Sequence, residues 1–212
     1  MATKHGTTWP TKGDSISEEQ YKSLKEYGSN KGVQILKSLK QYDGSPQTIK
    51  NAIDDIEKIV KSNPRFEKMT RSVILDISFN MSDDDYAETS GYKITLNANA
   101  FRNTDLLEID YQKSVSEGWF VKGTTHRAIV KHEMGHIYER LMKEKGAPIK
   151  AITKMIETDD NNAIKTFLRE NVSVYASTRK NEILPEVFSS VYDSNEDNKI
   201  TLQIYQECNK IK

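Results

Sequence analysis

The sequence predicts a mainly helical α+β fold with one small β-sheet. Three observations lead to this prediction. Apolar residues recur at helical spacing over residues 17–61, they alternate with polar residues over 72–79 and 91–97, and helical spacing then returns. Helices that precede and follow a block of strands, instead of alternating with them, are typical of an α+β fold.

Three helices are expected before the strands, at residues 17–26, 33–41 and 46–61. Ser17 and Gln20 form a capping box at the start of the first helix, and Gly28 and Gly32 are expected to break it. Pro46 follows Ser45 and suits the first position of the third helix. The first 14 residues are polar, so we expect a disordered tail at 1–14.

The middle of the chain is expected to form the sheet. Residues 72–79 and 91–97 place their apolar side chains on one side, as half-buried strands do, and the polar stretch 81–91 is expected to be a loop. Further helices are predicted at 105–117, from Thr124 or Thr125 to Leu141, and at 148–157, 161–170, 182–192 and 200–210.

Composition limits the class of protein. The chain has 212 residues, of which 31 are Lys or Arg and 31 are Asp or Glu, so no basic excess indicates a nucleic-acid partner. Its one cysteine, Cys208, excludes a disulfide framework and a zinc site built from cysteines. The N-terminus lacks the apolar region of a signal peptide, and no apolar run is long enough to span a bilayer.

A possible metal site lies in the helix that ends at Leu141. His132, Glu133 and His136 form the pattern His-Glu-x-x-His. Residues four apart share a face of a helix, so both imidazoles can bind one metal ion, and Glu133 can act as a base on water bound to that metal. Gly135 in mid-helix suggests close approach by another element. The alternative is an ordinary amphipathic helix with two solvated histidines.

A catalytic zinc site needs a third protein ligand. No histidine follows His136, and we place His126 on another side of the helix, so the third ligand should be acidic. Glu182 and Glu186 lie four residues apart in an apolar stretch, where buried carboxylates need partners. We assign Glu182 as the ligand and Glu186 as the acceptor that orients a ligand histidine. The alternative is a charged outer face of a helix near the C-terminus.

The spacing of these residues resembles that of a known family. His-Glu-x-x-His is followed by SVYASTRKNEILPEVF, residues 173–188. The pattern is similar to that of the anthrax lethal factor-like zinc metallopeptidases, which are gluzincins related to Pro-Pro endopeptidases and to phage-encoded proteins. The resemblance implies a zincin-like fold, with Glu182 as third ligand, Tyr175 steadying the oxyanion and Glu186 in the outer shell. Pro185 departs from the family pattern.

The resemblance also implies a place for substrate. The family pairs an extended substrate with an edge strand that corresponds here to Lys93, Ile94, Thr95, Leu96 and Asn97. It implies a single metallopeptidase domain at 15–212, with a helical part at 15–65 and a catalytic part at 66–212. Zn²⁺ is the expected cofactor.

The expected function is zinc-dependent hydrolysis of peptide bonds in a protein or peptide substrate, with Glu133 as general base. One alternative is a catalytically inactive zinc-binding module of a phage or mobile-element protein, and another is a hydrolase of different substrate range such as a deamidase. We expect a monomer with neither nucleic-acid nor membrane partners. Synthesis in the cytoplasm is expected by default, with release, export by another route and excision from a precursor left open.

Residues 193–200 resemble the first part of a calcium-binding EF-hand loop. Asn198 stands where that loop needs glycine, and Ile204 stands where it needs a bidentate glutamate. We therefore expect a helix-capping turn in place of a calcium site, with calcium binding weak or absent.

Overall fold

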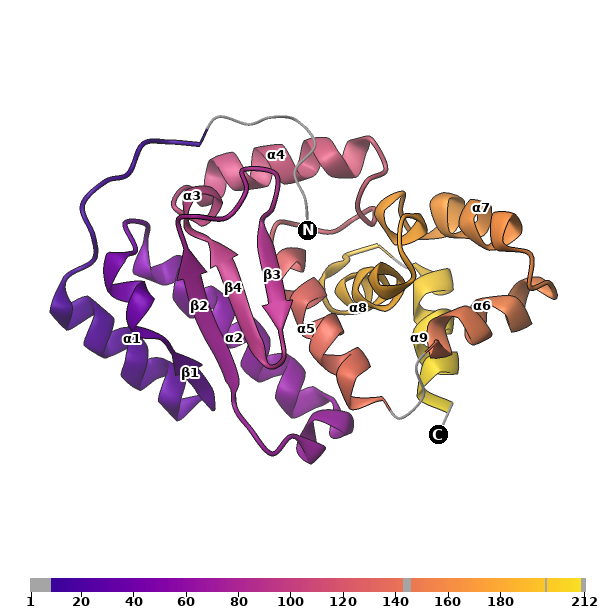
Figure 1. The fold of residues 1–212 in the computed structure, drawn as a ribbon, viewed down its shortest axis with the longest axis horizontal. Coiled ribbons are helices and arrows are strands. Elements are labelled where there is room, and N and C mark those ends of the chain that lie inside the picture. Colours follow the sequence, from indigo (N-terminus) through magenta and orange to yellow (C-terminus); the bar gives the residue numbers. More distant parts are fainter. Residues whose placement is uncertain (1–8, 143–145, 197, 211–212) are drawn as a thin grey trace. The chain divides into compact units, whose positions relative to one another are not determined.

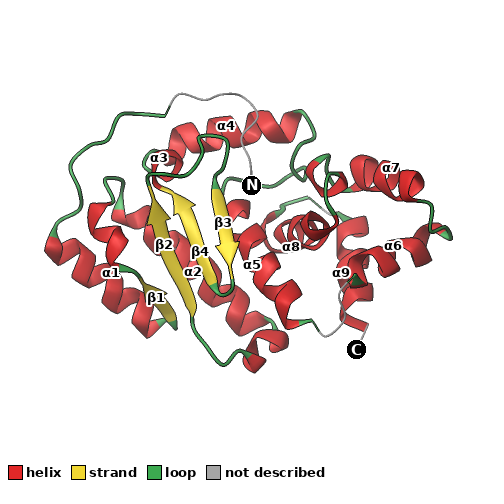
Figure 2. Cartoon of the chain, viewed as in Figure 1, coloured by secondary structure: helices red, strands yellow, loops and turns green. Residues whose placement is uncertain are grey.

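The computed structural model describes residues 9–142, 146–196 and 198–210. Within these residues helices dominate and four strands form a small sheet, so the predicted mainly helical α+β class is confirmed (Figures 1 and 2). The contacts divide the chain into two compact units, Met1–Tyr111 (unit 1) and Gln112–Lys212 (unit 2).

Unit 1 contains the sheet together with the helices around it. Its elements are α1 (Glu18–Asn30), β1 (Val33–Ile35), the 3₁₀ turn η1 (Lys37–Gln41), α2 (Pro46–Ser62), η2 (Pro64–Lys68), β2 (Val73–Ser78), β3 (Ala87–Ser90), β4 (Lys93–Asn97) and α3 (Ala98–Phe101). Helix α4 (Thr104–Ser116) crosses the boundary between the units.

The sheet has the strand order β1-β2-β4-β3. Strands β1, β2 and β4 are parallel, with Ile35 opposite Leu75 and Leu75 opposite Ile94, whereas β3 runs antiparallel to β4. Gly91 makes the turn between β3 and β4 with a φ of 66°, a backbone conformation that favours glycine. The sheet is therefore mixed, with β2 and β4 in its centre.

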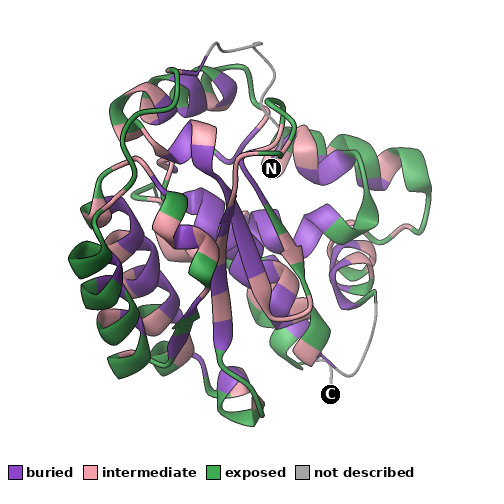
Figure 3. Ribbon diagram, turned by 60° about the vertical axis from the view of Figure 1, so that its left-hand side comes forward, coloured by how far each residue is buried: buried purple, intermediate pink, exposed green. Residues whose placement is uncertain are grey.

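The core of unit 1 follows the predicted periodicities. Ile49, Ile53 and Ile56 form one face of α2 and are buried, as helical spacing predicts. Strand β2 alternates buried and half-buried residues along its length. Figure 3 shows the central strands mostly buried and the exposed residues gathered on the outer faces of helices.

Three local predictions in unit 1 were wrong. Residues 33–41 do not form a helix, because Val33–Ile35 pairs with β2 as strand β1 and only a 3₁₀ turn follows. Gly28 does not end α1, which continues to Asn30 and stops before Gly32, the other glycine expected to break it. A Cβ at Gly28 would lie 2.8 Å from the Val33 carbonyl oxygen, so this glycine permits close packing of α1 on β1. Part of the expected loop 81–91 forms strand β3.

Part of the expected N-terminal tail is described, and residues 1–8 lie outside the described residues. Trp9 is buried, and its ring lies 6.4 Å from that of Tyr86 in an edge-on arrangement. The backbone N–H of Gly13 donates a hydrogen bond of 2.6 Å to the Asp43 carboxylate. Residues 9–14 have no regular secondary structure, yet they are attached to unit 1 at these two points.

Unit 2 consists of helices joined by short turns. Its elements are α5 (Ala128–Leu141), α6 (Ala147–Ile156), α7 (Asn161–Asn171), the 3₁₀ turns η3 (Tyr175–Ser177) and η4 (Lys180–Glu182), α8 (Ile183–Asp193) and α9 (Lys199–Lys210). The four helices predicted after Gly146 are all present, and their bounds differ from the prediction by one residue at most.

The core of unit 2 lies where α5, α8 and α9 meet. Helix α8 packs against α5 and α9, and α6 packs against α9 (Figure 1). An aromatic cluster fills this region, because the ring of Phe188 lies 5.1 Å from that of Tyr138 and 4.6 Å from that of Tyr192. Tyr205 of α9 lies 5.8 Å from Tyr138. In the part of the chain that is described, no helix has both the length and the apolar character needed to cross a bilayer.

Candidate metal centre

The His-Glu-x-x-His sequence lies on helix α5, as predicted. The rings of His132 and His136 have their centroids 5.0 Å apart, so both occupy one face. His132 is fully buried and His136 is partly exposed. The predicted start of this helix was wrong, because α5 begins at Ala128 and no side chain caps it. The Thr125 hydroxyl instead accepts a hydrogen bond of 3.2 Å from the Arg127 N–H, in the turn before the helix.

Glu182 brings a carboxylate to both histidines. Its Oε2 lies 3.2 Å from Nε2 of His132 and 3.5 Å from Nε2 of His136. Ligand atoms bound tetrahedrally to zinc at 2.0–2.1 Å are separated by roughly 3.3–3.4 Å. Both measured separations are close to that value, so the Glu182 oxygen is spaced from each histidine nitrogen as two ligands of one metal ion could be.

Glu186 lies on the opposite side of the His132 ring. Its Oε1 is 2.9 Å from Nδ1 of His132, and both side chains are fully buried. A carboxylate can only accept, so Nδ1 carries a proton and donates to Glu186. The structure therefore places the residue predicted to orient a ligand histidine in contact with that histidine.

Burial and hydrogen bonding shift the pKa values of His132 and Glu182 in opposite directions. Burial alone would lower the pKa of His132, but its hydrogen bonds to Glu182 and Glu186 outweigh burial and raise that pKa to about 9. Burial alone would raise the pKa of Glu182, but the hydrogen bonds from His132 and His136 hold it well below its usual range. The site thus stabilises a carboxylate beside a positive charge.

Glu133 and Tyr175 lie beside these donors. The ligand atoms of His132, Glu133 and His136 all lie within 4.8 Å of one another, and Glu133 is buried. The Tyr175 ring lies 5.8 Å from the His132 ring and meets Phe120 edge-on at 6.0 Å. Unit 2 therefore contains every residue predicted for the metal centre and its chemistry.

The backbone fixes the position of Tyr175. Its N–H donates to the Trp119 carbonyl at 3.2 Å, and the N–H of Val174 donates to the Gly118 carbonyl at 2.8 Å. These two hydrogen bonds attach the turn that carries Tyr175 to the segment that precedes α5.

Helices α5 and α8 approach each other closely at Gly135. A Cβ at this position would lie 2.6 Å from the Cα of Pro185 and 3.1 Å from the Cβ of Phe188. This confirms the prediction that Gly135 reflects a close approach. Pro185 is the third residue of α8, in the first turn, where its missing N–H costs no helical hydrogen bond.

A buried ion pair connects the same two helices farther along. The ammonium group of Lys131 pairs with the carboxylate of Asp193, the last residue of α8. Asp193 also accepts hydrogen bonds from the N–H of Thr125 at 2.6 Å and from its hydroxyl at 3.0 Å. The first residue of the EF-hand-like stretch thus has a structural role, and Asn198 of that stretch accepts from the Thr201 N–H at 3.1 Å near the start of α9.

Sequence reasoning missed two residues that contact the acidic groups. The Ser173 hydroxyl donates to Glu186 at 2.8 Å and accepts from the Ala176 N–H at 3.0 Å, which joins the Tyr175 turn to the outer carboxylate. The side-chain amide of Asn181 donates to Oε1 of Glu182 at 3.0 Å. Asn181 directly precedes a predicted ligand, and this position was the available signal. Ser173 gave no such signal.

The expected substrate strand needs correction. Strand β4 (Lys93–Asn97) pairs with β2 on one side and with β3 on the other, so it is a central strand of the sheet. Its main-chain groups are already used, and an extended peptide cannot add to it by strand pairing. Strand β3, which the sequence did not predict, takes the edge position beside it.

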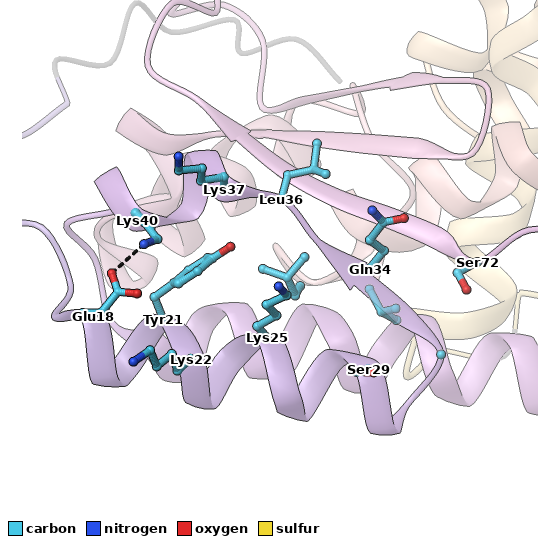
Figure 4. A pocket seen from close by; sticks show the side chains of 13 residues that line it. Glu18, Tyr21, Lys22, Lys25, Ser29, Gln34, Leu36, Lys37, Lys40 and Ser72 are labelled. Carbon is cyan, nitrogen blue, oxygen red and sulfur yellow. Dashed lines mark hydrogen bonds and ion pairs between the residues drawn. The ribbon is translucent and has the colours of Figure 1, made fainter.

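Unit 1 also contains a surface hollow of about 650 Å³ between α1 and the β1–η1 segment (Figure 4). Lys22, Lys25 and Lys37 line it and are exposed, whereas Lys40 forms an ion pair of 2.6 Å with Glu18. The lining contains no histidine or cysteine. This hollow therefore lacks the donors of a zinc site.

Comparison of the chain with models of known families, with curated proteins and with solved structures finds no match. Arguments about function therefore rest on the residues of the site.

Proposed function

We propose that the chain is a zinc-dependent hydrolase of peptide bonds. The observation that carries this proposal is the position of the Glu182 carboxylate, 3.2 and 3.5 Å from Nε2 of two histidines that lie one turn apart on α5. Two imidazoles and one carboxylate leave a fourth position open in a tetrahedral zinc site, as catalytic zinc sites require. A closed structural site would need a fourth protein ligand.

The residues around the donors support hydrolysis. When bound, zinc would supply a Lewis acid that lowers the pKa of water and polarises a carbonyl group. Glu133 would take a proton from the attacking water and pass it to the leaving amine. The Tyr175 hydroxyl would donate a hydrogen bond to the substrate oxygen as negative charge develops on it. Glu186 would hold His132 in the tautomer that leaves Nε2 free to bind the metal.

The metal itself is tested by elemental analysis of purified protein. We expect about one zinc per chain in the wild type and little zinc in Glu182→Ala. Glu88→Ala, in unit 1, is the matched control and should retain zinc. Iron in place of zinc would refute the metal assignment. Zinc retained by Glu182→Ala would refute the ligand assignment.

Catalysis is tested by digesting a peptide library and reading the products by mass spectrometry. Glu133→Gln should bind zinc as the wild type does and cleave nothing, because it keeps the shape of the side chain and loses the base. Tyr175→Phe should lower kcat by roughly 10²–10³-fold with unchanged zinc content. Zinc binding by the wild type without cleavage of any peptide would favour the alternative of an inactive zinc-binding module.

A further inference from the structure

Unit 2 contains a small pocket on which the proposed chemistry does not depend. Its volume is about 210 Å³, and its lining comes from α6, α7, the segment 176–180 and the first residue of α8. Ligand sites for larger molecules occupy roughly 300–1,000 Å³, so this pocket suits one or two aliphatic side chains.

The inner part of the pocket is apolar. Ile164, Leu168, Ala176 and Ile183 line it and are all buried, and Ile149 adds a half-buried side chain. An aliphatic group that enters would lose its contact with water, which is favourable by roughly 25 cal/mol per Å² of apolar surface.

The rim of the pocket is positively charged. Lys165, Arg179 and Lys180 line it and are exposed, and the lining contains no acidic residue. Within the described part of the chain, none of these three cations forms an ion pair or a hydrogen bond. The net charge of the whole chain is zero, so three unpaired cations around one pocket form a local excess that suits an anion.

Polar groups of the rim suit a peptide. The Asn161 side chain lines the pocket and has no hydrogen-bond partner among the described residues. The hydroxyls of Ser177 and Thr178 donate to backbone carbonyls at 2.6 and 2.7 Å, so each keeps lone pairs that can accept from an amide N–H. A fatty acid has no amide to pair with these groups, whereas a peptide offers both a donor and an acceptor.

We propose that this pocket binds the C-terminal end of a peptide whose last residue is aliphatic. The side chain enters the apolar interior, the terminal carboxylate meets the cations of the rim, and the preceding amide meets Asn161 and the hydroxyls. The segment 176–180 joins Tyr175 to Glu182, so a bound peptide contacts the chain between two residues of the candidate metal centre. The inference stands apart from the proposed hydrolysis, because binding here uses neither zinc nor Glu133.

The test is a titration of the full chain with acetyl-Ala-Leu. Binding is monitored by calorimetry and by the NMR signals of the isoleucine methyl groups. The matched probe acetyl-Ala-Leu-amide lacks only the terminal charge. We expect it to bind about tenfold more weakly, because one charge-assisted hydrogen bond is lost. Acetyl-Ala-Ala should bind more weakly because it leaves the apolar interior unfilled. Titrations are made with metal-stripped and with zinc-loaded protein, and the affinities should agree.

Two variants locate the binding. The triple variant Lys165→Gln, Arg179→Gln, Lys180→Gln should lower the affinity for acetyl-Ala-Leu about tenfold or more and abolish the preference over the amide. Ile164→Phe should lower the affinity for both probes by filling the interior. The matched control is Lys22→Gln, Lys25→Gln, Lys37→Gln, which removes the same charge from the hollow of Figure 4 and should bind as the wild type does.

Several results would overturn the inference. Equal affinities for acetyl-Ala-Leu and acetyl-Ala-Leu-amide would show that the rim cations do not bind the terminal carboxylate. Binding only by the zinc-loaded protein would place the carboxylate on the metal, and equal loss in both triple variants would indicate attraction to overall charge. If binding does not saturate at millimolar peptide, the pocket is a gap in side-chain packing and not a binding site. Zinc binding and cleavage would be unaffected by any of these results, so failure of the pocket and failure of the proposed function can be distinguished.

Discussion

Replacing Gly135 by alanine should damage the metal site more than it damages the fold. The added Cβ would lie 2.6 Å from the Cα of Pro185, which is about 0.8 Å less than the 3.4 Å at which ordinary contact begins. The obstacle is backbone, so no side-chain rotation relieves it, and α5 and α8 must separate. Alanine favours the helix over glycine by about 1 kcal/mol, and overpacking costs about 1–3 kcal/mol. The expected net destabilisation is therefore only about 0–2 kcal/mol.

The same separation of α5 from α8 would act directly on the proposed zinc ligands. His132 and His136 lie on α5, and Glu182 immediately precedes α8. Their separations of 3.2 and 3.5 Å already match tetrahedral zinc, and an additional 0.8 Å or so exceeds what bonds of about 2.0–2.1 Å can span. Mutating a residue that only orients a metal ligand typically costs 10–100-fold in metal affinity, and we expect a loss of at least that size for Gly135→Ala.

The assay compares zinc affinity by chelator competition with stability from urea unfolding. Ile53→Val is the control, because it lies in the core of unit 1 and should cost about 0.5–1.5 kcal/mol without changing zinc affinity. A Gly135→Ala variant that is about 1 kcal/mol more stable, with zinc affinity equal to that of the wild type, would refute the close-approach reasoning. It would mean that helix propensity alone decides the outcome.

Three further predictions follow from buried contacts. Glu186→Gln should lower zinc affinity about 10–100-fold, as measured by chelator competition. Ser173→Ala should lower it less, and Ser173→Thr, which keeps the hydroxyl, should bind zinc as the wild type does. Lys131→Met leaves the buried Asp193 without its cation and should destabilise the chain by about 3 kcal/mol in urea unfolding, whereas Lys154→Met, from an exposed pair, should cost less than about 1 kcal/mol. Burial raises the pKa of Tyr42 above its unfolded value of 10.0, so the stabilising contribution of this side chain is complete below pH 10 and is lost as the pH rises further. The free energy of unfolding should therefore fall less between about pH 9 and 11.5 in Tyr42→Phe than in the wild type. Equal slopes in the two proteins would contradict this.

The errors in the predicted fold share a physical cause. Residues 33–35, Val-Gln-Ile, are too short for their apolar positions to distinguish a helix from a strand. Their pairing with Val73–Leu75, about 40 residues away, decides the outcome. Strand β3 contains Ala87 and Glu88, which have weak strand preference, and Thr89 is its one β-branched residue. It exists because β4 offers a partner across the Gly91 turn. Where the pattern was long and strongly periodic, as in α2, local residues were sufficient.

The candidate site could be predicted where its geometry is local. The two histidines share a face because four residues make about one helical turn, whatever surrounds them. Glu182 and Glu186 could be predicted because carboxylates in an apolar stretch need partners. The roles of Ser173 and Asp193 could not be predicted, since each depends on a contact between segments whose relative position the sequence does not specify. Ser173 contacts Glu186, 13 residues away, and Asp193 contacts Lys131, 62 residues away.

The hydrogen bonds of His132 show why the two distant carboxylates have different roles. Glu186 accepts from Nδ1 and from the Ser173 hydroxyl, so both of its oxygens are engaged away from the proposed metal position. Nε2 of His132 consequently points to the other side of the ring, where the Glu182 carboxylate also meets Nε2 of His136. Glu182 is the one that lies between both histidines, and its negative charge can offset part of the charge of a divalent ion. In the proposed site, the outer carboxylate, Glu186, would therefore fix the direction of a donor atom, and the inner one, Glu182, would supply both a donor atom and a charge.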